Sequence, residues 1–234
     1  MLNEIADNEM KDKENLKESL SDISHQLKTP LTSIIIILDN ILDNPDMEQT
    51  VREDFIKDIK REITNIQFLV ANLLKLSKLD ANSVQFINKE VKVEEIIQNV
   101  VKNVSSICDL KNIKINITGD LKAKIVCDER WQIEAITNIV KNAAEHSKTD
   151  SEIDISYEQN KAYTKVEIKD YGAGISNSDI KHIFQRFYKS KNSAKDSIGI
   201  GLPLAKSIIE RNNGYIEVTS EEGKGTTFTI KYLK

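Results

Sequence analysis

The sequence has 234 residues, of which 39% are hydrophobic and 30% are charged. This length can bury a full core and allows one or two domains. The formal net charge of -4 gives no electrostatic reason to expect binding to nucleic acid or to an acidic membrane. Cys108 and Cys127 lack the spacing of a metal site or a disulfide framework, so we expect both to be buried, reduced thiols.

No stretch of the sequence is suited to cross a membrane. Its longest uninterrupted apolar run, residues 34–38, is far shorter than the roughly 18 residues that a spanning helix needs. It also lacks a signal-peptide pattern. Together with the reduced cysteines, this predicts a cytoplasmic chain, in which any link to a membrane runs through a sensor region that the sequence does not contain.

The pattern of residues 1–80 predicts two long helices. The segment contains no glycine, and apolar residues recur at steps of three and four on either side of the turn signal Asn44-Pro45-Asp46. An antiparallel hairpin of this kind has an apolar stripe that it cannot bury alone. We therefore expect two copies to pair into a homodimeric four-helix bundle.

The remaining sequence predicts a mixed α/β domain. All the glycines lie after residue 118, and helix and strand patterns alternate. We expect a linker at 81–92, followed by a domain over 93–234 that folds as a layered α/β sandwich with helices on one face of the sheet. The expected helices are 93–110, 129–146 and 202–211, and the expected strands are 114–118, 124–127, 152–157, 163–169, 215–219 and 226–232.

His25 is the first candidate for a reactive side chain. The apolar stripe takes Ile23, Leu27 and Leu31, which leaves His25 on the solvated side of its helix. A neutral imidazole there is a nucleophile near neutral pH, and Pro30 should bend the helix beside it. Taken alone, these residues are explained more simply as a surface histidine near an incidental kink.

A second group of residues is suited to phosphate and metal chemistry. Asn138 and Asn142 lie on one face of a predicted helix, where two amide oxygens can help to hold a magnesium ion that also binds nucleotide phosphates. Asp170 ends an apolar strand and precedes Gly172 and Gly174. A carboxylate there can accept the exocyclic amine of adenine, while the glycines let the main chain approach the ring.

The next glycine pair is also followed by a helix. Gly199 and Gly201 precede the predicted helix at 202–211, and such a helix N-terminus suits phosphate oxygens. The polar loop between residues 174 and 199 predicts a mobile lid. Four basic residues of this loop could face a triphosphate: Arg186, Lys189, Lys191 and Lys195. For the last two, a solvated surface is the simpler interpretation.

In this order, the motifs resemble those of the sensor histidine kinases of two-component systems. Residues 25–30 resemble the H box, 138–143 the N box, 170–175 the first glycine box, 183–188 the aromatic box and 199–202 the second glycine box. Each motif is weak alone, but their order is specific and extends from about residue 15 to the end. The resemblance implies a dimerisation and phosphoacceptor hairpin followed by an ATP-binding domain of the gyrase, chaperone and histidine kinase type.

The resemblance also implies an activity and roles for single residues. It implies ATP-dependent autophosphorylation of His25, phosphotransfer to an aspartate of a response regulator receiver domain, and phosphatase activity toward that regulator, in which Thr29 positions water. The cofactors would be ATP and Mg²⁺, with Asn142 as a metal ligand, and no nucleic acid is involved. The implied ATP-binding residues are Asn138, Asn142, Asp170, Gly172, Gly174, Ile175, Lys189, Gly199, Gly201, Leu202 and Thr226.

Several residues depart from the pattern of that family. Gln26 follows the phosphoacceptor where the family usually has an acidic residue, and an amide is a poor base. Glu145 and His146 stand where Lys and Tyr are common, and Ser197 replaces a common glycine. A second reading therefore stays open, in which the chain is a regulatory module that binds ATP but phosphorylates His25 poorly. A third alternative, an ATPase of the same nucleotide-binding fold that is not a kinase, would not explain the hairpin with its H box.

Overall fold

The computed structural model of the protein describes residues 2–190 and 199–234, with side chains from residue 21 onward. The chain forms two compact units, Met1–Ala71 and Asn72–Lys234. None of the helices in these described ranges combines the length and the apolar character that crossing a membrane would require.

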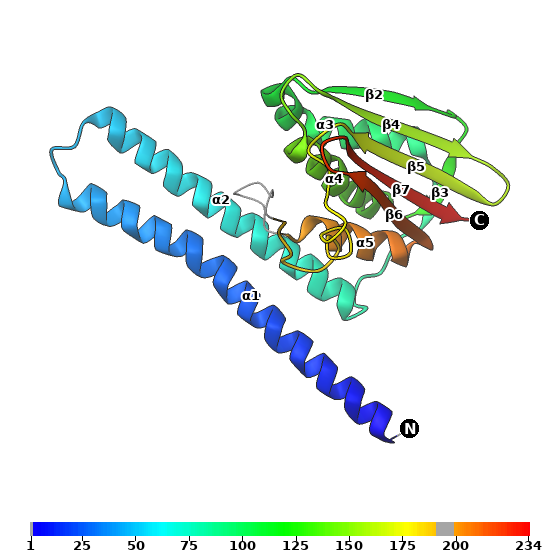
Figure 1. The fold of residues 1–234 in the computed structure, drawn as a ribbon, viewed down its shortest axis with the longest axis horizontal. Coiled ribbons are helices and arrows are strands. Elements are labelled where there is room, and N and C mark those ends of the chain that lie inside the picture. The colour runs from blue at the N-terminus through cyan, green and yellow to red at the C-terminus, as the bar shows by residue number, and fades with distance from the viewer. Residues whose placement is uncertain (1, 191–198) are drawn as a thin grey trace. The chain divides into compact units, whose positions relative to one another are not determined.

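The first unit consists of the helical hairpin that the sequence predicts. Helices α1 (Leu2–Asp43) and α2 (Gln49–Asp80) run antiparallel on either side of a short turn (Figure 1). Pro30 lies inside α1 and does not end it. Many apolar side chains of the hairpin remain exposed in the single chain, among them Leu31, Ile35, Ile36, Leu42, Ile56 and Ile63.

The second unit is an α/β sandwich, as the sequence predicts. Its five-stranded sheet has the order β2-β4-β5-β7-β6, in which only β2 and β4 are parallel, and a separate two-stranded sheet pairs β1 with β3. Three helices lie on one face of the large sheet (Figure 1). The elements are β1 (Lys89–Lys92), α3 (Val93–Lys111), β2 (Lys114–Gly119), β3 (Lys124–Cys127), α4 (Glu129–His146), β4 (Glu152–Gln159), β5 (Tyr163–Asp170), α5 (Gly201–Arg211), β6 (Gly214–Glu221) and β7 (Gly225–Leu233).

Two boundaries differ from those expected. The range 81–92, expected to be a linker, contains β1, whose four residues are too few to show a strand period and which is held by pairing with β3. The last turns of α2 fall into the second unit. Lys75 forms an ion pair with Glu134 of α4 at 2.7 Å, and Arg211 at the end of α5 donates to the Leu79 carbonyl.

The core of the second unit lies between the three helices and the inner face of the large sheet. It is built from fully buried aliphatic and aromatic side chains, including Ile96, Ile136, Ile139, Ile155, Val166, Ile168, Leu204, Ile208, Phe228 and Ile230. The hydroxyl group of the buried Tyr232 donates to Gln132 Oε1 at 2.6 Å. Cys108 and Cys127 are buried free thiols, as expected, and burial raises the pKa of Cys127 to about 12.

Asp128 is the N-cap residue of α4 and also forms a hydrogen bond to the segment before β1. Its Oδ1 accepts hydrogen bonds from the main-chain N–H groups of Arg130 at 3.1 Å and Trp131 at 3.3 Å. Its Oδ2 accepts from the N–H of Ile87 at 2.9 Å. Asp128 is only 9% exposed, so these donors would lose their partner without gaining full access to water.

We therefore expect Asp128→Ala to lower the free energy of unfolding of the second unit by about 1–2 kcal/mol, the usual cost of a lost N-cap. Asp128→Asn should cost less, because its amide oxygen can still cap α4 although its NH₂ group cannot accept from Ile87. Urea unfolding followed by circular dichroism measures both. Equal losses for the two variants would show that the cap contributes nothing beyond the contact with Ile87.

Candidate active site

His25 lies on α1 with its side chain exposed, whereas Ile23 and Leu27 are half-buried, as the apolar spacing predicts. Gln26, next to it, is half-buried. The hydroxyl of Thr29 donates a hydrogen bond to the main-chain carbonyl of His25 at 3.2 Å. An imidazole and a hydroxyl group one turn apart therefore share one exposed face of α1. These three predicted site residues belong to the first unit, and all the others belong to the second.

Asp170 is the last residue of β5 and is only 3% exposed. Its Oδ1 accepts hydrogen bonds from the main-chain N–H groups of Gly172 at 2.9 Å and Thr226 at 3.2 Å. Burial raises the pKa of this carboxyl group, because its charged form is poorly solvated, and the two N–H groups offset part of the effect. No described residue donates to Oδ2, so this oxygen can accept from a ligand.

The loop after β5 and the turn between β6 and β7 approach each other closely around Asp170. Gly174 and Gly225 have φ angles of 70° and 116°, which favour glycine. A Cβ atom at either position would lie 2.1 Å from a main-chain oxygen, that of Glu221 for Gly174 and that of Asp170 for Gly225. Only glycine allows these contacts, so the two residues bring both segments up to the carboxylate.

Ser220 joins the same two segments through its hydroxyl group. Its Oγ accepts from the Ile175 N–H at 2.8 Å, donates to the Gly225 carbonyl at 2.9 Å and lies 2.9 Å from the Thr226 hydroxyl. Ile175 and Thr226, both predicted site residues, are therefore held by one side chain that no sequence pattern marks. A serine near the end of a strand is common, and only the fold brings it to the loop after β5.

Helix α4 carries Asn138 and Asn142. Asn138 is 9% exposed, its amide donates to the Glu134 carbonyl at 3.0 Å, and its Oδ1 would lie 3.2 Å from a Cβ atom at Gly201. Asn138 is thus fixed against the start of α5. Asn142 is half-buried, and within the described ranges its amide has no hydrogen-bond partner. Its oxygen is therefore available to a ligand on the same helix face.

The start of α5 follows the predicted glycine pair. The Gly199 carbonyl accepts from the Phe187 N–H at 2.9 Å, and Gly201 is the first residue of the helix, followed by the buried Leu202. Lys189 is exposed. Lys191, Lys195 and Ser197 lie outside the described residues.

Glu145 and His146, which depart from the family pattern, are the last two residues of α4. Glu145 lies 3.7 Å from the Lys141 ammonium, one helical turn earlier, so a nearby charge of opposite sign offsets its own. The main-chain carbonyl of His146 accepts from the Ala173 N–H at 3.4 Å. Lys111 donates to three carbonyl groups of this helix end, which belong to Ala144, Glu145 and Ser147, at 2.9, 2.6 and 3.1 Å. The end of α4 is thereby held beside the loop after β5.

Arg186, one of the four basic loop residues that could face a triphosphate, is bonded to a carboxylate. Its Nη2 donates to both carboxylate oxygens of Asp80, the last residue of α2, each at 2.7 Å. A guanidinium group held in this way is directed at a carboxylate. Lys189 is the other one of the four basic loop residues that the structure describes, and its side chain is exposed.

The described ranges contain no group of three or more His, Cys, Asp or Glu side chains that could hold a metal ion. Other oxygen ligands, such as amide, main-chain or phosphate oxygens, are the candidates here. Asn142 is one of them, because a neutral amide oxygen can supply one position while phosphate oxygens supply others.

Two family models match the chain. The one described as "Histidine kinase-, DNA gyrase B-, and HSP90-like ATPase" matches residues 127–234, and "His Kinase A (phospho-acceptor) domain" matches residues 15–82. All the predicted nucleotide-site residues fall in the first range, and His25, Gln26 and Thr29 fall in the second.

Similar proteins include two named sensors. The "Heme sensor protein HssS" of Staphylococcus saprophyticus is 33% identical over 216 residues, which cover 92% of this chain and 46% of that protein. The "Sensor protein SrrB" of Staphylococcus aureus is 30% identical over 223 residues, covering 93% and 38%. The chain thus spans less than half the length of these relatives.

Solved structures share the fold. The Acinetobacter baumannii histidine kinase AdeS has a TM-score of 0.74 at 22% identity, covering 89% of this chain and 97% of that one. The histidine kinase ThkA, in a crystal structure with the response regulator protein TrrA, has a TM-score of 0.77 at 21% identity, covering 97% and 65%. With both family domains in order and the sensor proteins as relatives, the chain belongs to the sensor histidine kinases of two-component systems.

Proposed function

We propose that this chain transfers the γ-phosphoryl group of ATP to His25 and passes it to an aspartate of a response regulator receiver domain. The observation that carries the proposal is the buried carboxylate of Asp170, with one oxygen held by two N–H groups and the other left for a ligand. It lies in the same unit as Asn142, in a chain whose other unit carries an exposed histidine.

Adenine recognition would depend on Asp170. Its Oδ2 would accept the exocyclic amine, and the Thr226 hydroxyl, fixed 2.9 Å from Ser220 Oγ, could bind a bridging water. Gly172, Gly174 and Ile175 would line the ring, since their main chain is fixed next to the carboxylate. A buried polar site of this kind rejects bases without a matching donor, because the carboxylate would then stay buried and unpaired.

The phosphates would lie between α4 and the start of α5. The Asn142 amide oxygen would ligate Mg²⁺, which would offset charge on the triphosphate. Asn138, fixed against Gly201, would form the pocket wall. Gly199, Gly201 and Leu202, at the α5 N-terminus, would lie near the phosphates, and Lys189 would add a positive charge.

His25 would attack as a neutral imidazole. A nitrogen–phosphorus bond forms, the bond to the β-phosphate oxygen breaks, ADP leaves, and the ring loses a proton to solvent. Gln26 can accept a hydrogen bond from the ring but cannot take that proton at neutral pH. In the second step the phosphoryl group moves to the regulator's carboxylate and the nitrogen–phosphorus bond breaks. Hydrolysis of the phosphorylated regulator would use Thr29 to hold water, after its hydroxyl turns away from the His25 carbonyl.

The partners follow from the exposed surface of the hairpin. Leu31, Ile35 and Ile36 are each about half exposed, at 48%, 57% and 55%, and a second copy of the chain would cover such side chains in a homodimeric bundle. The regulator would dock beside His25. A sensor region outside this sequence would receive the signal and carry any link to a membrane.

We expect acid-labile label to appear on the chain when it is incubated with γ-labelled ATP and magnesium, and His25→Gln to abolish it. His182→Gln serves as the control, because this histidine is half-buried in the second unit. No label on the unaltered chain would favour a module that only binds ATP. Label that persists in His25→Gln would place the acceptor elsewhere.

Asn142→Ala should abolish labelling, because the metal loses its protein ligand, while Mg²⁺-free nucleotide still binds. Fluorescent nucleotide titrations with magnesium and with a chelator separate the two effects. Asn99→Ala is the matched control, since within the described ranges the Asn99 amide bonds to the Glu95 carbonyl of its own helix and to no other residue. Equal Mg²⁺ dependence in Asn142→Ala and the unaltered chain would remove Asn142 from the metal site.

Asp170→Asn should weaken ATP binding at least about tenfold, the effect of one lost charge-assisted hydrogen bond. It should also change the stability of the free protein. Since the pKa of Asp170 is raised on folding, the folded state keeps this proton to higher pH, and stability falls as pH rises from the ordinary to the raised pKa.

The asparagine variant lacks that titration. Its free energy of unfolding should therefore decrease less between acid and neutral pH than that of the unaltered chain, measured without nucleotide by urea unfolding. Parallel pH curves for the two proteins would contradict the assignment of the raised pKa to Asp170.

A further inference from the structure

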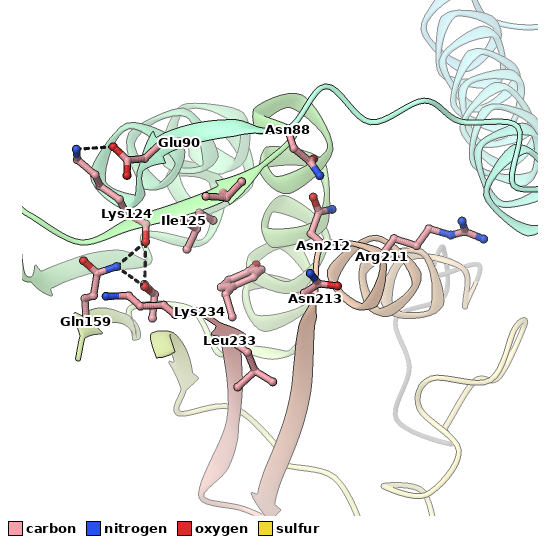
Figure 2. A pocket seen from close by; sticks show the side chains of 13 residues that line it. Asn88, Glu90, Lys124, Ile125, Gln159, Arg211, Asn212, Asn213, Leu233 and Lys234 are labelled. Atoms are coloured by element: carbon pink, nitrogen blue, oxygen red, sulfur yellow. Dashed lines mark hydrogen bonds and ion pairs between the residues drawn. The ribbon is translucent and has the colours of Figure 1, made fainter. Parts of the chain in front are cut away.

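The second unit has a pocket of about 460 Å³ at the end opposite to Asp170 (Figure 2). Strand β5 begins beside the pocket, where Thr164 lines it, and ends at Asp170. Helix α5 runs the other way, from Gly201 to Arg211 at the pocket. The pocket is therefore separate from the nucleotide site, although the same strand and helix reach both.

The free edge of β3 faces this pocket. The Val93 N–H donates to the Ala123 carbonyl, so in the antiparallel register of β1 and β3 the Val91–Ile125 pair exchanges main-chain hydrogen bonds. In that alternation the N–H and C=O groups of Val126 point away from β1. Val126 lines the pocket, and no described residue bonds to its main chain.

Side chains already occupy both ends of this edge. The Lys124 carbonyl accepts from Gln159 Nε2 at 2.7 Å and from the Thr164 hydroxyl at 2.9 Å. The Asp128 N–H donates to Asn212 Oδ1 at 3.3 Å. The side chains of Gln159, Thr164 and Asn212 thus form the hydrogen bonds that a neighbouring strand would form at Lys124 and Asp128. Between these two positions, the main-chain N–H and C=O groups of Val126 have no partner among the described residues.

Further amide groups and an apolar floor surround the open edge. The side chains of Asn88, Asn212 and Asn213 gather at one wall (Figure 2). The Asn212 amide already bonds to the Asp128 N–H and to the Ile208 carbonyl, which leaves the exposed amides of Asn88 and Asn213 for a ligand. Amides suit a peptide main chain, because both have a donor and an acceptor. Tyr232 and Ile125, each only 4% exposed, provide apolar surface for a side chain.

The charge at the mouth has the opposite sign to that of the whole protein. Three basic side chains, Lys124, Arg211 and Lys234, and one acidic side chain, Glu90, line the pocket, whereas the chain carries a net charge of -4. Glu90 pairs with Lys124 at 2.7 Å. Among the described residues, Arg211 donates to two neutral oxygens, those of the Leu79 carbonyl and the Asn82 amide, and no carboxylate there forms an ion pair with it. The mouth therefore favours an acidic ligand.

We propose that this pocket docks a short, extended, acidic peptide segment of a partner protein, which adds a strand to β3 by pairing its main chain with Val126. Exposed strand edges bind peptides in this way, with main-chain hydrogen bonds supplying affinity and side-chain pockets supplying selectivity. A bound segment would contact α5 beside Arg211, the residue that also holds Leu79 at the end of α2. This role is additional to kinase activity and does not depend on it.

The test uses the full chain and a fluorescein-labelled peptide of alternating Glu and Val residues. Fluorescence anisotropy should show saturable binding, and the same peptide N-methylated on alternate main-chain nitrogens should not bind. At saturation, hydrogen exchange of the Val126 amide should slow by about tenfold or more, while that of Ile125, already paired with Val91, should change little. Equal binding of the N-methylated peptide, or an unchanged Val126 amide, overturns strand pairing.

Two variants test the charge. Lys234→Glu should weaken binding by about threefold to tenfold at low salt, whereas Lys102→Glu, exposed on α3 and outside the pocket, should not. Equal effects of the two variants would show non-specific attraction and refute the site. His25→Gln should bind the peptide like the unaltered chain, so a failure of the kinase proposal leaves this result interpretable.

Discussion

The nucleotide-binding unit depends on the burial of one carboxylate. Asp170 ends strand β5 and is only 3% exposed, and burial of a charged group is costly unless it is hydrogen-bonded. Two main-chain N–H groups meet part of that requirement, and they come from segments 54 residues apart in the sequence, at Gly172 and Thr226. Because Oδ2 has no donor among the described residues, the free protein favours a ligand that supplies one. The exocyclic amine of adenine would be such a donor and would contribute both affinity and selectivity.

The surrounding structure holds these donors in place. The close approach at Gly174 and Gly225 brings two loops together without side chains between them, and Ser220 joins them through hydrogen bonds to Ile175 and Gly225. On the other side, Lys111 closes the end of α4 beside the same loop. Several weak contacts together thus fix the position of the main chain around Asp170. Single substitutions at these contacts should therefore affect nucleotide affinity even though they do not remove the carboxylate that would bind adenine.

The departures from the family pattern have different consequences. Glu145 lies 3.7 Å from the ammonium group of Lys141, whose charge of opposite sign offsets part of its own. Gln26 has a chemical consequence, because an amide cannot take the imidazole proton as the acidic residue usual at this position can. Arg186, which from its position in the loop could face a triphosphate, forms an ion pair with Asp80. Loop charges could not be assigned to partners from sequence, because a flexible basic side chain can reach several acceptors.

The sequence by itself determined the helical hairpin, the α/β sandwich, the outward position of His25 and the order of the Asn, Asp and glycine motifs, since these depend on local periodicity and spacing. Only the tertiary structure decided that Ser220 joins the loop after β5 to the start of β7, that β1 lies within the expected linker and that the edge of β3 is open at Val126. Each of these depends on contacts between segments distant in the chain, and neither a short strand nor a single serine has a periodic signal of its own.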